Sequence, residues 1–146
     1  MLKAFGHKGR SPFLLSRKGS SRALAENYFG LDPEIESKLR KENGSLLDEI
    51  SLAIIEGIDE IVLTHHGGGC GGYSDKKFLN PQQEEDFQIG DMIMVVMHLF
   101  IEFPELKKIT GIYFRIEEKK VNESVKVFEL NREYLIQIGL IPNIYY

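Results

Sequence analysis

The chain has 146 residues, of which 42% are hydrophobic and 27% are charged, and this composition excludes a disordered protein. That length is enough for one hydrophobic core, so we expect a single domain over residues 1–146. The net charge of −4 offers no general attraction to nucleic acid or to acidic membranes, and neither is expected as a partner.

The N-terminal half of the chain is expected to begin with two short strands, at residues 2–5 and 13–15. Ser20 or Ser21 can then cap a helix through residue 27. Asp32-Pro33-Glu34 is a strong helix start, and that helix should stop near Asn43-Gly44. A further helix with an apolar stripe is expected from Ser45 to a cap at Gly57.

The C-terminal half predicts strands alternating with helices. Strands are expected at residues 58–64, 109–116 and 125–130, an apolar helix at 92–103 after a polar stretch, and a last helix capped by Asn131. The apolar helix is too short to span a bilayer. Such alternation is typical of a mostly parallel sheet with helices on both faces. We therefore expect a flavodoxin-like, three-layer α/β domain, with an antiparallel last strand allowed.

A glycine-rich segment follows the strand at 58–64 and carries the side chains best suited to chemistry. Residues 64–73 are Thr-His-His-Gly-Gly-Gly-Cys-Gly-Gly-Tyr. Thiolate and imidazole are the ligands that zinc prefers, and sites in open α/β sheets form at the carboxyl ends of strands. Because adjacent strand residues point to opposite faces, His66 rather than His65 is expected to join Cys70 at a metal. Alternatively, Cys70 is a small buried hydrophobe and the histidines are structural.

Other features near this segment have several interpretations. The amides of its glycines could bind a small anion; these are Gly67, Gly68, Gly69 and Gly71. The acidic pair Glu84-Glu85 is expected to be solvated surface, and His98, among apolar neighbours, a core or interface histidine. Since Cys70 is the only cysteine, no intrachain disulfide is possible, and a reducing, cytoplasmic location is expected.

The strand at 61–64, the two histidines, a short loop and Cys70-Gly71 resemble the second zinc motif of the β-class carbonic anhydrases. Residues 13–19, Phe-Leu-Leu-Ser-Arg-Lys-Gly, are similar to that family's strand ending in an arginine and a glycine turn. Residues 103–106, Phe-Pro-Glu-Leu after an apolar helix, resemble a small prokaryotic branch. The resemblance implies a zinc-dependent lyase acting on carbon dioxide or a similar small electrophile, with bicarbonate or another small anion as ligand, in a homodimer or larger oligomer.

The chain departs from that family at both zinc motifs. Three residues separate His66 from Cys70, where the family has two. The family's first motif, Cys-x-Asp-x-Arg, has its nearest counterpart in Gly6-His7-Lys8-Gly9-Arg10, which lacks the cysteine and the aspartate. Arg10 is the candidate for the catalytic arginine of that motif.

A third zinc ligand has to come from elsewhere, since a catalytic zinc normally has three protein ligands. The candidates are His7, His65, Asp75 and another subunit. Three functions stay open at this point: a divergent zinc enzyme, a catalytically inactive relative whose glycine loop binds a small anion or a protein partner, and a purely structural or interaction protein.

Overall fold

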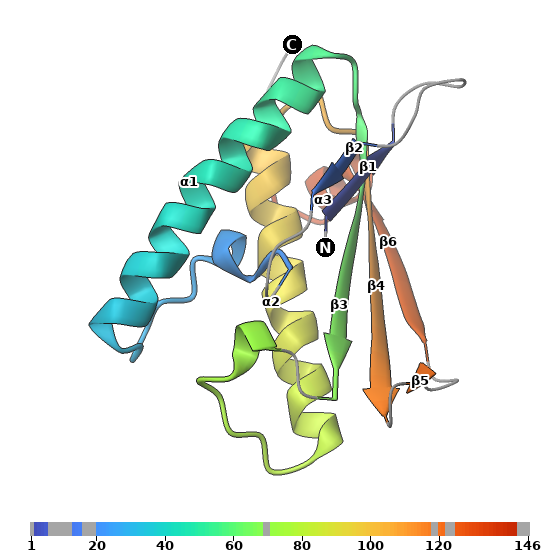
Figure 1. The fold of residues 1–146 in the computed structure, drawn as a ribbon. Coiled ribbons are helices and arrows are strands. Elements are labelled where there is room, and N and C mark those ends of the chain that lie inside the picture. Colours follow the sequence, from blue (N-terminus) through green and yellow to red (C-terminus); the bar gives the residue numbers. More distant parts are fainter. Residues whose placement is uncertain are drawn as a thin grey trace.

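The fold is seen in a computed structural model, which describes residues 2–5, 13–15, 20–68, 71–117, 120–121 and 125–142 (Figure 1). In chain order the elements are β1 (Leu2–Phe5), β2 (Phe13–Leu15), the 3-10 helix η1 (Arg22–Ala25), α1 (Pro33–Ile55), β3 (Glu60–Gly67), the 3-10 helix η2 (Gly71–Tyr73), α2 (Pro81–Glu102), β4 (Lys108–Glu117), β5 (Lys120–Val121), β6 (Lys126–Asn131) and α3 (Arg132–Gln137). None of these helices is long and apolar enough to cross a membrane.

The strands form one mixed sheet in the order β2-β1-β3-β4-β5, with β6 also paired to β4. Among the described strands only β3 and β4 run parallel, and the other pairings are antiparallel. The α/β class is confirmed, but the predicted mostly parallel order is wrong. Parallel neighbours need a long crossover, which α2 supplies between β3 and β4, whereas β1–β2 and β4–β6 are joined by short connections that favour antiparallel pairs. The other long connection, through α1, joins β2 to β3, which are not neighbours in the sheet.

The long helices lie on one side of the sheet (Figure 1). Burial alternates along β3 and along β4, so that each strand has one buried face and one partly exposed face. The strand register aligns the two buried faces, with Ile61 beside Ile109 and His65 beside Tyr113. The second helical layer that the sequence predicted is not found in the described part of the chain.

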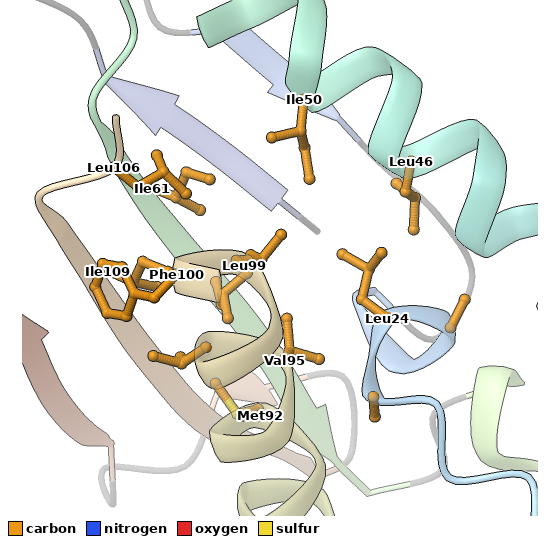
Figure 2. Close-up of a cluster of buried hydrophobic side chains, with 14 of the residues drawn as sticks. Leu24, Leu46, Ile50, Ile61, Met92, Val95, Leu99, Phe100, Leu106 and Ile109 are labelled. Carbon is orange, nitrogen blue, oxygen red and sulfur yellow. The ribbon is translucent and has the colours of Figure 1, made fainter. Parts of the chain in front are cut away.

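Helix α1 is continuous where the sequence predicted two helices separated at Asn43-Gly44. Leu39, Leu46, Ile50 and Ala53 recur at helical spacing on both sides of this point, and all four are buried. Packing of this single face outweighs the cost of a glycine inside a helix, which is about 1 kcal/mol relative to alanine. Figure 2 shows Leu46 and Ile50 within the buried cluster.

Helix α2 also begins earlier than predicted, because Asn80 caps it by accepting a hydrogen bond from the Gln83 amide at 2.8 Å. The second half of its buried face is apolar and fills the core around Val95 and Leu99 (Figure 2). The first half of the same face buries three polar side chains instead, Glu84, Gln88 and Asp91. α2 therefore places a row of polar groups beside the carboxyl end of β3.

The sequence predicted the helix starts best where a side chain caps the helix. The Asp32 side chain accepts from the Glu34 amide at the start of α1, and the Asn131 side chain accepts from the Tyr134 amide at the start of α3. Both caps were predicted and both are confirmed. The helix predicted after Ser20 or Ser21 is present as the shorter η1, with Ser21 at its cap position.

Candidate functional site at the carboxyl end of the parallel strands

The two parallel strands end side by side, with Gly67 of β3 in register with Arg115 of β4. Gly68 follows with φ +87°, and a Cβ there would collide with the backbone carbonyl of Ile116. At Gly67 the Tyr113 hydroxyl occupies the space that a Cβ would need. The first two glycines of the loop are thus required by close packing against β4 and, at Gly68, by backbone conformation as well.

On the core side of β3, His65 joins two other buried polar residues. The Ser21 hydroxyl lies 2.7 Å from Nε2 of His65, and the side-chain oxygen of Gln88 lies 3.2 Å from Nδ1. The side-chain nitrogen of Gln88 donates to the backbone carbonyl of His66 at 2.8 Å. This bond directs the Gln88 oxygen toward Nδ1, so Nδ1 carries the proton and Nε2 accepts from Ser21. Burial lowers the pKa of His65 to about 3, so the ring is neutral.

His66 points to the opposite, partly exposed face, as the alternation of strand side chains predicted. Its ring stacks on Phe114 with the centroids 6.0 Å apart, and its Nδ1 lies 3.3 Å from the carbonyl of Gly67. Because both ring nitrogens of His65 have hydrogen-bond partners in the core, ligation by His65 would break one of those bonds. His66 is the better placed of the two histidines for a site at the glycine loop.

An arginine on η1 connects to the far end of the glycine loop. Arg22 donates to the carbonyl of Gly72 at 2.6 Å and to both carboxylate oxygens of Asp75 at 2.5 and 2.9 Å. Its guanidinium also stacks on the Tyr73 ring, 4.7 Å from the centroid. The hydrogen bond from Arg22 holds the pKa of Asp75 below its usual value. Asp75, a predicted third zinc ligand, is therefore already engaged in an ion pair.

A second buried acid lies behind the same loop. The Tyr73 hydroxyl donates to Asp91 at 2.8 Å, and only 3% of Asp91 is exposed. Burial raises the pKa of this carboxyl, with the hydrogen bond from Tyr73 acting against that rise. The connections of Arg22 and Asp91 fix the segment after the loop to η1 and to α2.

Glu84 connects the loop to the end of β4. Its Oε1 accepts from the Gly68 amide at 3.0 Å and from Nη1 of Arg115 at 2.7 Å. Nε of Arg115 donates to Glu117 at 2.7 Å. The interpretation of the Glu84-Glu85 pair as solvated surface is therefore wrong for Glu84, which is 7% exposed. Nothing in the local sequence distinguishes it from a surface glutamate, because its partners lie on other elements.

The other predicted residues fall into two groups. His98 is only partly buried and lies 3.0 Å from the carbonyl of Leu24, on η1. Several predicted site residues lie outside the described part of the chain, namely His7, Arg10, Gly69 and Cys70. Within the described ranges, no group of three His, Cys, Asp or Glu side chains is arranged to hold a metal ion. Zinc ligation by His66 and Cys70 stays a prediction.

No family model, curated protein or solved structure matches this chain. The resemblance to β-class carbonic anhydrases accordingly depends on the sequence motifs alone.

Proposed function

We propose that the chain is a divergent relative of the β-class carbonic anhydrases whose site, at the carboxyl end of β3, binds zinc through His66 and Cys70. The observation that carries this proposal is the separation of the two histidines. His65 is held in the core by Ser21 and Gln88, whereas His66 lies on the other face at the beginning of the glycine loop. Zinc at such a site supplies a Lewis acid that lowers the pKa of a bound water toward about 7.

The contacts of the other candidates bear on the third ligand. His65 and Asp75 each have partners in the core or in an ion pair. If either residue bound zinc, its present partners would be left buried without a hydrogen bond or an opposite charge, which is costly in free energy. The proposal therefore assigns the third ligand to His7 or to a second subunit and keeps Arg10 as the candidate catalytic arginine. The cytoplasmic location and the homo-oligomer of that family belong to the same proposal.

The test is the metal content of protein purified without a metal-affinity tag, with His66→Gln and Cys70→Ser as variants. About one zinc per chain is expected in the natural protein, as a single site requires, and little in either variant. His98→Gln removes a histidine away from the glycine loop and should keep its zinc. If the natural protein contains no metal, the zinc proposal is wrong. If it contains zinc, a carbon dioxide hydration assay is the next measurement.

A catalytically inactive, anion-binding relative is the second candidate function. One observation favours it: the Gly68 amide already donates to a carboxylate, that of Glu84. A backbone N–H group that donates to a carboxylate can donate to other oxyanions as well. This candidate predicts that bicarbonate or phosphate binds equally well before and after treatment with a chelator.

A further inference from the structure

Three hydrogen-bond donors face one small region at the carboxyl ends of β3 and β4. Two of them, the Gly68 amide and Arg115, donate to Oε1 of Glu84. The third is the Tyr113 hydroxyl, which lies where a Cβ of Gly67 would stand. Glu84 Oε1 and Arg115 Nη1 lie 3.0 and 3.1 Å from that same point. Gly68 directly follows β3, and Arg115 and Tyr113 belong to β4, so the ends of the two parallel strands bring the three donors together.

Among the described residues the buried Tyr113 hydroxyl has no acceptor for its proton, since the group that interacts with it as a hydrogen-bond partner is Arg115, which can only donate. Tyr113 is 2% exposed. A buried hydroxyl whose proton has no acceptor costs about 1–3 kcal/mol, so such a group needs an explanation. Burial, and next the negative charge of Glu84, raises the pKa of Tyr113 to about 12, so at neutral pH the phenol keeps its proton and can donate it.

We propose that the Gly68 amide, Arg115 and the Tyr113 hydroxyl form a binding site for a small oxyanion of the size of bicarbonate or phosphate, and that the Glu84 carboxylate occupies it as an intramolecular competitor. The inference deepens the anion-binding candidate function and does not depend on zinc. It gives the Tyr113 hydroxyl an acceptor, since an oxyanion has more acceptor oxygens than the single Oε1 that the Gly68 amide and Arg115 now share.

The surroundings allow Glu84 to leave while Arg115 stays paired, and the incoming anion replaces Glu84 as the acceptor for the Gly68 amide. Arg115 keeps its bond to Glu117, so its charge stays paired when Glu84 moves away. The side chains of Glu84 and Arg115 are 10% and 22% exposed, which places the site just beneath the surface. The neighbouring Glu85 pairs with Lys126 at 2.9 Å, and its charge acts on Tyr113 more weakly than that of Glu84 does. An anion can therefore exchange with the carboxylate by rotation of one side chain.

The experiment measures binding of bicarbonate and of inorganic phosphate to chelator-treated protein at constant ionic strength. Calorimetry gives the affinity, and the NMR shift of the Gly68 amide reports the place of binding. Glu84→Gln removes the competing charge and is expected to tighten binding about 10-fold, the factor that one charge-assisted hydrogen bond supplies. Glu85→Gln removes the same charge from the neighbouring residue and is expected to change the affinity less than about 2-fold, since that carboxylate is already paired with Lys126.

Tyr113→Phe tests the third donor by removing a single oxygen. Anion binding should weaken about 10-fold, since a hydrogen bond to a charged group is lost. The stability of the free protein should stay level or increase, because the proton of the lost hydroxyl had no acceptor. Equal anion affinity in Tyr113→Phe and the natural protein, or equal effects of Glu84→Gln and Glu85→Gln, would overturn the proposal.

A variant with a shorter acidic side chain supplies a second test if Glu84→Gln does not fold. Glu84→Asp keeps the charge but reaches the donors less well, so it should bind the anion more tightly than the natural protein does. An unchanged affinity in that variant also counts against the proposal. Because chelator-treated protein is used, failure of the zinc site and failure of the anion site give separate results.

Discussion

Lowering the pH from 7.5 to 5 is expected to cost the folded state about 2 kcal/mol through His65. Burial lowers its pKa to about 3, against an ordinary value of 6.5 in the unfolded chain. Between those two values the unfolded chain binds a proton that the folded protein does not, so stability falls as the pH falls. Each pH unit below 6.5 then costs about 1.4 kcal/mol. The loss is expected to begin near pH 6.5 and to continue toward pH 3.

The assay is urea denaturation at pH 7.5 and pH 5, for the natural protein, His65→Gln and the control His98→Gln. His65→Gln should be less stable at pH 7.5, since Ser21 and Gln88 lose a partner, but should lack most of the additional loss at pH 5. His98→Gln should keep that loss. The reasoning is refuted if His65→Gln loses as much stability between the two pH values as the natural protein does.

Two further substitutions test the connections behind the glycine loop. Arg22→Met leaves the Asp75 carboxylate without its guanidinium, and because that side chain is only 14% exposed, thermal unfolding should show a loss of about 3 kcal/mol. Combined with Asp75→Asn, it should cost less than the sum of the two single changes. Asp91→Asn should increase the free energy of unfolding relative to the natural protein, and the increase should be larger at pH 8 than at pH 4. Burial raises the pKa of Asp91, so the natural folded state loses stability as the pH rises through that raised pKa, and the variant does not. An equal difference at both pH values would contradict this.

Local signals were enough to predict many of the elements, but not how they associate. The caps at Asp32 and Asn131 were predictable because a side chain and an amide two or three residues away form them. The break expected at Asn43-Gly44 was wrong because the apolar residues on both sides of it pack against the same core. Strand direction failed for a similar reason: it depends on the length of each connection and on partners distant in sequence.

For the candidate site, strand alternation correctly assigned His65 and His66 to opposite faces. The partners of these residues could not be predicted. Ser21 is 44 residues from His65, and Gln88 is 23. Glu84 and Gln88 resemble solvent-facing helix residues until the fold places β3 and β4 beside them. Polar residues can be buried only where their partners are buried with them, and a single sequence does not show that pairing.

One side of β3 belongs to the buried core and the other to the proposed zinc site, and a hydrogen bond from Gln88 connects the two. Gln88 is oriented by His65 and donates to the carbonyl of His66, so the core network helps to fix the backbone from which the proposed zinc ligand projects. A change at His65 should therefore alter both the unfolding free energy and any metal affinity at His66. Cys70→Ser, by contrast, should alter metal affinity while leaving the pH dependence of unfolding in place. This difference separates damage to the scaffold from damage to the site, because only the scaffold includes the buried, titrating histidine.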